Sequence, residues 1–486
     1  MEFLFKMRPK KNRLKGKGKY MKKNVFVALS LALGISHAAV NFPFPQNSNY
    51  NGRATVLSDQ ASVAEQLKSG FAYWMETFYN ESGDIAGVRS NEGSNEYFSE
   101  GVGYGMLLAV YFSDNTTSYE PEFQKLWNFY KKFMNANGLM IWKIGNLSES
   151  WDPGNGAALD GDMDVAAALI LGAYQFGNTE YLAAAKTLLQ NMKAHEFEAN
   201  GIHLPGDTWG DAGKNRKNPG YFDPAYMPLF AMADPDNAEF WSVTAYNANM
   251  NLYETSSNEV STGLIDDWTN ASGKSEDDYF GYDASRAPWR NAKAVCWFGD
   301  ERALAIDRKM AAWVSTVAPS NMKGPVLRSS GELGNDHNST FVASLMTAFV
   351  SDASYQANLD AYWAEAVNLG KENYFNQSLK LLNGLLVSGN MPNLAAGSLP
   401  PIGIAPKTSP EKVFQVNGKN IALEVSKNSP VQVDLVNLYG AVEKTLFRGN
   451  ASGVLNLSAD GVKSGVYVLR VREGASLWTK TLRLGL

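Results

Sequence analysis

Residues that carry soft-metal, redox and disulfide chemistry are scarce in this sequence. Among 486 residues there is one cysteine, Cys296, and there are four histidines. One cysteine excludes an intramolecular disulfide framework, and so few thiols and imidazoles exclude a zinc or iron–sulfur cluster protein. The sequence also has no Gly-x-Ser-x-Gly motif and no phosphate-binding loop. The chemistry must therefore come from aspartate and glutamate, and we expect no cofactor and no metal.

Apolar and aromatic residues, by contrast, are plentiful. The chain is 45% apolar and 19% charged, which permits a large core and argues against disorder. With 12 tryptophans, 22 tyrosines and 24 phenylalanines, we expect aromatic side chains on the surface or along a groove.

The N-terminal segment, residues 1–38, has the pattern of a basic leader and a secretory signal peptide. Residues 1–23 contain ten Lys and Arg and one acid, and the run that follows is uncharged. Its apolar part, Val25–Ile35, is too short to span a bilayer, and small residues precede a cleavage point ahead of Ala39. We expect a protein that is secreted or held at the cell surface of a bacterium, with a signal peptide over residues 21–38.

Removal of this segment changes the charge of the chain. Residues 39–486 carry 34 basic and 48 acidic residues, a net charge of −14. Such a charge disfavours nucleic acid and anionic membranes as partners, and it is compatible with a neutral or a cationic polysaccharide. A basic nucleic-acid-binding arm is the alternative interpretation of residues 1–20.

Helical periodicity runs from about Asp59 to Phe375, within a catalytic domain expected over residues 39–390. In the first expected helix Val63, Leu67, Phe71, Trp74 and Phe78 recur every three or four positions behind a cap at Ser58 or Asp59. Comparable patterns recur near residues 100–113, 121–136, 161–176, 178–194, 225–233, 236–254, 284–298, 301–317, 340–350, 354–369 and 372–385. Twelve helices separated by Gly-, Asn- and Asp-rich loops predict six helical hairpins, an all-α (α/α)6 barrel.

A change of composition marks the C-terminal region. Residues 391–410 are rich in Pro, Gly, Ala and Ser and are expected to form a linker. Residues 411–486 carry ten basic and six acidic residues and alternating runs such as Val431–Leu435 and Val466–Val471, which predict a small β-sandwich. The end of this domain resembles the C-terminal secretion and sorting domains of some fibre-degrading and gliding bacteria, so secretion or cell-surface machinery is its expected partner.

Two blocks of sequence place carboxylates in settings that suit catalysis. In Ser99–Met106 (SEGVGYGM) Glu100 opens a helix behind a capping serine, among glycines that clear space for a ligand; a simple N-terminal helix charge is the alternative. The block LDGDMD, residues 159–164, mimics the start of a calcium loop. However, Val165 and Leu171 stand where such a loop needs Gly and Glu, so the aspartates are catalytic or belong to a capped first helical turn.

A third block, GYDASR at residues 281–286, pairs a carboxylate with an arginine. Asp283 and Arg286 are three positions apart and can share one face of a starting helix. The guanidinium then favours the charged carboxylate and can hold a substrate hydroxyl, or the two residues form only a local ion pair.

The three blocks together resemble glycoside hydrolase family 8 over a span from about Phe42 to Asn390. The order of the blocks agrees with that family, and one departure is Leu159, where the family usually has a small hydroxyl residue. The resemblance implies an (α/α)6 barrel that hydrolyses β-1,4-linked glycans with inversion at the anomeric carbon.

Roles for the carboxylates follow from this resemblance. Glu100 would be the general acid, Asp283 the general base, and Asp160 would hold the sugar at the cleavage subsite. Inversion requires two carboxyls roughly 6.5–9.5 Å apart, one protonated and one ionised. An aspartate in the third block indicates the branch of the family whose base lies there, rather than the chitosanase-like branch.

Aromatic residues are expected to bind the sugar rings. By resemblance Trp142 and Trp209 are sugar platforms, Tyr221 lies near the nucleophilic water, and Arg286 and Tyr282 also bind substrate. Core packing is the alternative for any tryptophan, and we expect it for Trp74, Trp127 and Trp313.

The expected protein is a secreted, monomeric endo-β-1,4-glucanase, a cellulase that acts on β-1,4-linked polysaccharide. Endo-β-1,4-xylanase is the nearest alternative, because xylose and glucose differ by one hydroxymethyl group that a pocket rejects only weakly. Chitosanase and a non-catalytic glycan-binding surface protein are further alternatives.

Overall fold

The computed structural model describes residues 40–50, 54–92, 96–145, 147, 156–396, 414–436, 442–473 and 476–484. The predicted leader and signal peptide and most of the predicted linker lie outside these residues. No helix in the described ranges is both long and apolar enough to cross a membrane.

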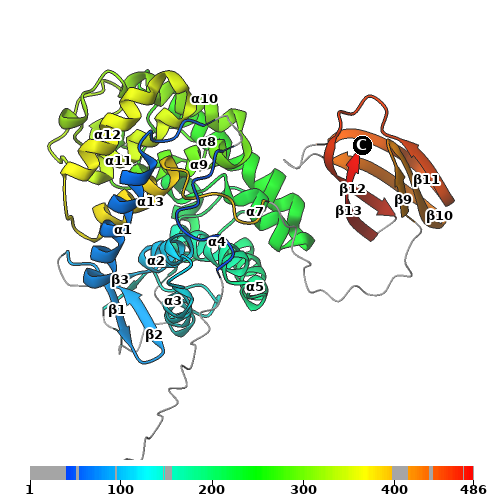
Figure 1. The fold of residues 1–486 in the computed structure, drawn as a ribbon, viewed down its shortest axis with the longest axis horizontal. Coiled ribbons are helices and arrows are strands. Elements are labelled where there is room, and N and C mark those ends of the chain that lie inside the picture. Colours follow the sequence, from blue (N-terminus) through cyan, green and yellow to red (C-terminus); the bar gives the residue numbers. More distant parts are fainter. Residues whose placement is uncertain are drawn as a thin grey trace, which may run out of the picture. The chain divides into compact units, whose positions relative to one another are not determined.

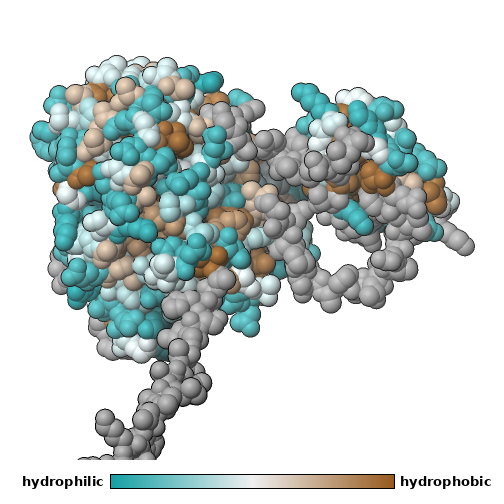
Figure 2. All heavy atoms as spheres, in the orientation of Figure 1, coloured by the Kyte–Doolittle hydropathy of each residue, from teal (hydrophilic) through white to brown (hydrophobic). Residues whose placement is uncertain are grey.

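Twelve helices in the described part of the chain form the predicted barrel (Figure 1). Six of them bury only one face and form its outer layer: α1 (Gln60–Thr77), α3 (Glu120–Lys132), α5 (Glu180–His195), α8 (Tyr246–Asn258), α10 (Glu301–Val314) and α12 (Gln356–Asn368). Their other faces are polar, and hydrophilic residues cover much of the face shown in Figure 2. The Asp59 cap of α1 is confirmed, since its carboxylate accepts a hydrogen bond from the amide of Ser62.

The six helices that alternate with the outer ones are buried on most of their circumference. They are α2 (Ser99–Phe112), α4 (Leu159–Phe176), α7 (Tyr226–Ala233), α9 (Ala287–Phe298), α11 (Ser339–Met346) and α13 (Tyr374–Val387). Helices that are buried on most of their circumference lie inside a protein, which makes these six the inner ring of the barrel.

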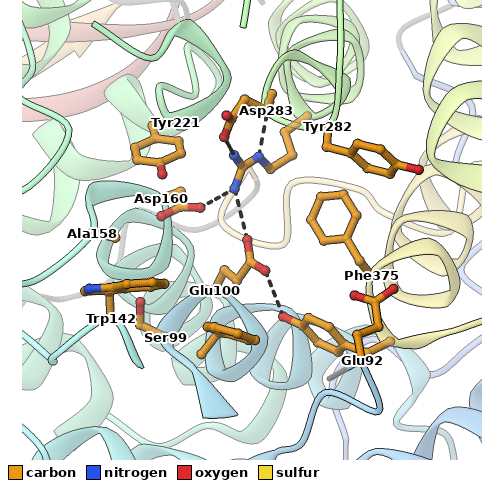
Figure 3. Close-up of a pocket in the computed structure, with 13 residues that line it drawn as sticks. Glu92, Ser99, Glu100, Trp142, Ala158, Asp160, Tyr221, Tyr282, Asp283 and Phe375 are labelled. Atoms are coloured by element: carbon orange, nitrogen blue, oxygen red, sulfur yellow. Dashed lines mark hydrogen bonds and ion pairs between the residues drawn. The ribbon is translucent and has the colours of Figure 1, made fainter. Parts of the chain in front are cut away.

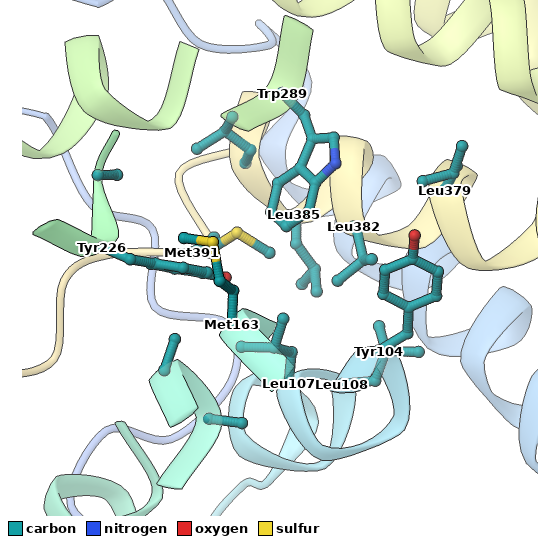
Figure 4. Close-up of a cluster of buried hydrophobic side chains, with 14 of the residues drawn as sticks. Tyr104, Leu107, Leu108, Met163, Tyr226, Trp289, Leu379, Leu382, Leu385 and Met391 are labelled. Carbon is teal, nitrogen blue, oxygen red and sulfur yellow. The ribbon is translucent and has the colours of Figure 1, made fainter. Parts of the chain in front are cut away.

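Side chains from the inner ring fill the centre of the barrel. Tyr104 and Leu108 of α2, Met163 of α4, Trp289 of α9 and Leu382 of α13 form part of one buried cluster (Figure 4). The ring is therefore a packed core rather than an open channel, and only its ends can carry a cleft.

The helix predictions from the sequence are confirmed, with local differences. The stretch expected over 236–254 begins as a π-helix, Phe240–Ala245, that continues into α8, and a short helix, α6 (Gly210–Asn215), was not expected. Trp74 and Trp127 are buried as predicted, whereas Trp313 is only half buried against the core.

Short antiparallel ladders tie together the loops between the helices. They are β1 (Tyr79–Ser82) with β2 (Ile85–Val88), β3 (Tyr97–Phe98) with β4 (Lys143–Ile144), β5 (Arg216–Lys217) with β6 (Thr269–Asn270), and β7 (Tyr279–Phe280) with β8 (Val326–Leu327). Strand β3 runs directly into α2, and β7 is followed by the 3₁₀ turn η4 (Ala284–Arg286) that leads into α9.

Alternation in the sequence predicted a small β-sandwich for the C-terminal region, and the structure has a small antiparallel β domain there, built from one curled sheet. Its strands are β9 (Phe414–Asn417), β10 (Asn420–Val436), β11 (Val442–Ser458), β12 (Gly465–Glu473) and β13 (Ser476–Leu484). They form one curled sheet in the order β11, β10, β12, β13, and β9 pairs with the first half of β10. Alternate residues in the two described parts of β10 are buried, Ile421, Leu423 and Val425 in one and Val431, Val433 and Leu435 in the other, so one face of the sheet forms this domain's core.

Candidate active site

The predicted catalytic residues meet where inner helices begin. Glu100 lies in the first turn of α2, Asp160 in the first turn of α4, and Asp283 immediately before η4 and α9. Tyr374 is the first residue of α13. All four line one cavity of about 360 Å³. Helix N-termini carry positive partial charge, so this end of the inner ring favours carboxylates.

Close contact between α2 and α4 brings Glu100 and Asp160 together. A methyl group on Gly103 would lie 2.7 Å from the Cβ atom of Asp164, and Gly161 packs equally closely against Ser99. The expectation that the glycines of the Glu100 block clear space for a ligand is wrong, because a methyl group on Gly101, Gly103 or Gly105 would lie 2.7–2.9 Å from a protein side chain. The expected serine cap is also wrong: Ser99 is the first helical residue, preceded by the extended Phe98, and α2 has no side-chain cap.

Arg286 joins the three carboxylates (Figure 3). Its Nη1 atom donates to Glu100 Oε2 at 2.9 Å and also to Asp160 Oδ2, and its Nη2 atom donates to Asp283 Oδ1 at 2.7 Å. The side chain of Arg286 is 4% exposed, and its guanidinium lies 4.8 Å from the centre of the Tyr221 ring. The local pair of Asp283 and Arg286 is thus present, and it belongs to a larger cluster.

Burial raises the pKa values of two carboxyl groups in the cluster, Glu100 and Asp160. Burial raises the pKa of Glu100 to about 7, and Asp160 adds to this shift while Arg286 opposes it. The hydroxyl of Tyr374 donates to Glu100 Oε1 at 3.2 Å. Burial also raises the pKa of Asp160, against the attraction of Arg286 and Arg290. A glutamic acid with such a pKa holds its proton near neutral pH, as a general acid must.

Asp283 has a more open setting than the other two carboxylates. Its side chain is 34% exposed, compared with 18% for Glu100 and 4% for Asp160. While Arg286 binds its Oδ1 atom, the indole Nε1 of Trp268 donates to its Oδ2 atom at 3.1 Å. A carboxylate held by two donors and open to water suits the role of a general base.

The predicted sugar platforms differ in position. Trp142 is 46% exposed, lines the cavity, and stacks on Phe98 with ring centres 5.9 Å apart. Trp209 is 38% exposed but is not among the cavity-lining residues, and it packs on Trp268 at 5.5 Å instead. Both tryptophans can offer a face to solvent, and only Trp142 does so beside the carboxylates.

The two predicted tyrosines both line the cavity. Tyr221, at the end of the 3₁₀ turn η1 (Pro219–Tyr221), lies beneath Arg286, and burial raises its pKa. Tyr282 is 41% exposed and donates its hydroxyl proton to Asp336 at 2.8 Å. Of all the residues predicted for the site, only Trp209 stands outside the cavity.

The other acids of the LDGDMD block have structural partners. Asp164 makes a paired contact with Arg290 at 2.7 and 2.8 Å, and Arg290 also approaches Asp223, which binds Lys293 at 2.6 Å. All four side chains are buried. They form a network of two acids and two bases beneath the cavity floor.

The third acid of that block, Asp162, faces away from the cavity. It accepts a hydrogen bond from Tyr130, and burial raises its pKa to about 8 beside the buried Glu196. Asp160 is therefore the one aspartate of the block that lines the cavity.

Several residues of the site were not predicted. Tyr374, Phe98, Phe375 and Glu92 line the cavity, and Trp268 binds Asp283 from outside it. The signal for Phe98 was its place directly before the Ser99 block. The others sit in stretches without a catalytic motif, and only the closed barrel brings them to the carboxylates.

A helical barrel with a buried glutamate and a more open aspartate, both beside an exposed tryptophan, is the arrangement expected of a glycoside hydrolase. The chain belongs to glycosyl hydrolase family 8, whose family model matches residues 42–389.

Named relatives agree with this family. The chain is 32% identical over 403 residues to Endoglucanase A of Acetivibrio thermocellus, covering 78% of this chain and 82% of that protein. It is 32% identical over 384 residues to Endoglucanase 2 of Ruminiclostridium josui, covering 76% and 81%. The solved structure of a beta-1,3-1,4-glucanase from Paenibacillus sp. X4 shares the fold, with a TM-score of 0.67, 24% identity, and coverage of 72% of this chain and 99% of that one.

Proposed function

We propose that this glycoside hydrolase is a secreted endo-β-1,4-glucanase that inverts the anomeric centre. The observation that carries the proposal is the meeting of Glu100, Asp160 and Asp283 on the single guanidinium of Arg286 at the cavity. Glucan as the substrate is supported by the relatives of 32% identity, which are endoglucanases by name.

In the proposed reaction the carboxyl groups of Glu100 and Asp283 act on opposite sides of the scissile bond. Glu100, whose pKa of about 7 keeps it protonated, gives its proton to the departing glycosidic oxygen. Asp283 takes a proton from the water whose oxygen bonds to the anomeric carbon as the glycosidic bond breaks. Asp160 accepts a hydrogen bond from the sugar at the cleavage subsite.

The spacing of the acid and the base is compatible with inversion. The two carboxylates bind different nitrogens of one guanidinium, at 2.9 and 2.7 Å. Their nearest oxygens therefore lie at most about 8 Å apart, which leaves room for the roughly 6.5–9.5 Å that a water between them requires.

A side-by-side assay tests the substrate. Product release is measured from carboxymethylcellulose, barley β-glucan, xylan and chitosan, and we expect the two glucans to be cleaved fastest. Activity on xylan or chitosan alone would contradict the glucanase proposal. The variants Glu100→Gln and Asp283→Asn control for contaminating enzymes, because each should lose nearly all activity while it still binds glucan.

The stereochemistry has a separate test. Proton NMR of the first products should show the α anomer before mutarotation, since one displacement at a β-linked carbon inverts it. If the β anomer appears first, Asp283 is not a general base in a single displacement.

Export and surface sorting are also proposed for the ends of the chain. Residues 21–38 would direct secretion, and residues 411–486, with ten basic and six acidic residues, would engage secretion or cell-surface machinery. Removal of residues 411–486 should preserve hydrolysis of soluble β-glucan and change where the protein accumulates. A large loss of hydrolysis would instead make the β domain a substrate-binding module.

A further inference from the structure

Asp283 lies outside the regular helices, on the turn between β7 and η4. A base on a turn needs other contacts to fix the direction of its carboxylate, because a general base works only at a defined distance from its water. Arg286 fixes one oxygen, but the same guanidinium also serves Glu100 and Asp160. The second oxygen, Oδ2, is bound by Trp268, which touches neither of the other acids in the described structure.

Trp268 is itself held by contacts with two neighbouring side chains. The guanidinium of Arg216 lies 4.4 Å from the ring centre, and Trp209 packs at 5.5 Å. Arg216 is in turn bound by Glu276 at 2.9 Å and by Asp277 at 3.1 Å. The indole cannot turn away from Asp283 without breaking this cation–π contact and the ring packing.

The residue before Trp268 fixes the backbone that carries Asp283. The Asp267 Oδ1 atom accepts hydrogen bonds from the amides of Gly281 at 2.8 Å and Ala284 at 2.7 Å, on either side of the base. The amide of Asp267 also donates to the carbonyl of Tyr279 at 2.8 Å. Two consecutive residues therefore hold both the main chain and the side chain of Asp283.

We propose that Trp268 is a positioning residue whose indole N–H orients the Asp283 carboxylate toward the attacking water. It fixes the rotation of the carboxylate about its last bond, so the lone pairs that are not used by Trp268 and Arg286 point to the water. This role rests on the proposed function of Asp283 as the general base. Trp268 is not among the residues that line the cavity, and its indole N–H is bound to Asp283, so we assign it a role through Asp283.

The first test removes the N–H group and keeps a ring in place. Trp268→Phe, and replacement of Trp268 by the sulfur isostere benzothienylalanine, should lower kcat on barley β-glucan by about 10- to 100-fold with KM within about twofold. The loss should persist on an aryl β-cellobioside with an activated leaving group, whereas the loss in Glu100→Gln should largely disappear there, because that substrate needs no acid.

A matched control is available on the outer layer. Trp363 of α12 donates its indole N–H to Gln66 at 2.7 Å, so Trp363→Phe removes the same kind of hydrogen bond far from the cavity. This control should melt at a lower temperature than the parent and keep its kcat. The proposal would be overturned if kcat were unchanged in both Trp268 variants. It would also be overturned if the variants regained the kcat of the parent on the activated substrate.

A measurement that does not depend on activity separates this inference from the proposed function. In ¹⁵N–¹H spectra of the full chain, the indole signal that disappears in Trp268→Phe should shift upfield in Asp283→Ala, because the hydrogen bond to a carboxylate is lost. A signal that stays in place would refute the contact. If the parent enzyme cleaves no glucan but the signal moves, the proposed function fails and the contact between Trp268 and Asp283 stands.

Discussion

The proposed acid, Glu100, owes its protonation to its surroundings rather than to its residue type. Burial raises its pKa to about 7, from the ordinary value near 4.5. Since the protonated form is the active one, kcat/KM should be constant below that pKa and fall about tenfold per pH unit above it. Measurement of kcat/KM on barley β-glucan between pH 5 and 9 tests this fall at alkaline pH.

An activated substrate provides the control for that profile. An aryl β-cellobioside whose leaving group needs no proton should lose most of the alkaline fall. If kcat/KM falls equally on both substrates at alkaline pH, another group causes the fall and Glu100 is not the general acid.

Single residues were predictable where their types form a local pattern. Glu100, Asp160 and the pair Asp283 and Arg286 each stand in a short block, and the cavity unites all four. Tyr374 was not predictable, because it meets Glu100 across 274 positions of sequence and carries no motif of its own.

At the scale of elements, the contact between α2 and α4 determines the distance between Glu100 and Asp160. A methyl group on Gly103 would lie 2.7 Å from the Cβ atom of Asp164 and 3.3 Å from the carbonyl oxygen of Gly161. Gly103→Ala should therefore push the helices apart and lower the free energy of unfolding by about 1–3 kcal/mol. Urea denaturation measures this loss, and kcat should fall with it.

A second glycine offers the comparison. Gly70 in α1 faces only the ends of Leu381 and Gln377, at 3.1 and 3.2 Å, and these flexible side chains can move. Gly70→Ala should be nearly neutral, because the higher helix propensity of alanine offsets the contact. Equal stability in the two variants would contradict the view that α2 and α4 need glycine at their contact.

The charged network beneath the floor links α4 with α9. Lys293 binds Asp223 at 2.6 Å between the rings of Trp289 and Tyr226, which lie 3.7 and 3.8 Å from its Nζ atom. Lys293→Met should cost about 3–5 kcal/mol in chemical denaturation, because it removes the shorter of the two ion pairs of the buried Asp223, whose other charged partner, Arg290, lies at 3.4 Å. Adding Asp223→Asn should recover much of that loss, and no recovery would mean that the lysine stabilises by packing alone.

Element boundaries were predictable because periodicity is a local property. Outer helices such as α1 showed apolar residues on one face, and this spacing survives in the structure. The neighbours of the glycines in α2 were not predictable, because they depend on which helix packs against α2. The ladder between β5 and β6 joins residues more than fifty positions apart and left no local signal.

At the scale of the whole molecule, buried acids make the stability depend on pH. The pKa values of Glu100 and Asp267 are raised to about 7 and that of Asp162 to about 8, mainly by burial. In the unfolded chain these groups titrate near pH 4, so between pH 6 and 8 the folded state binds protons that the unfolded state lacks. Rising pH should therefore lower the free energy of unfolding by on the order of 4 kcal/mol.

Thermal unfolding at pH 6, 7 and 8 checks this slope. His203 acts mainly outside that window: burial lowers its pKa to about 4, so it destabilises the fold below about pH 6.5, where the unfolded histidine gains a proton. Asp162→Asn, which mimics the protonated acid, should reduce the slope. A melting temperature that rises from pH 6 to pH 8 would contradict the protonation of these acids.

The closure of the inner ring has a consequence for the folding of the newly synthesised chain. Tyr374 at the start of the last inner helix binds the acid at the start of the first, and the base comes from a helix between them. A chain that is still being synthesised therefore has no partial activity. A premature stop anywhere before α13 leaves Glu100 without Tyr374. Hydrolysis begins only when the first and last hairpins of the barrel have met, so the appearance of product reports the completion of the fold.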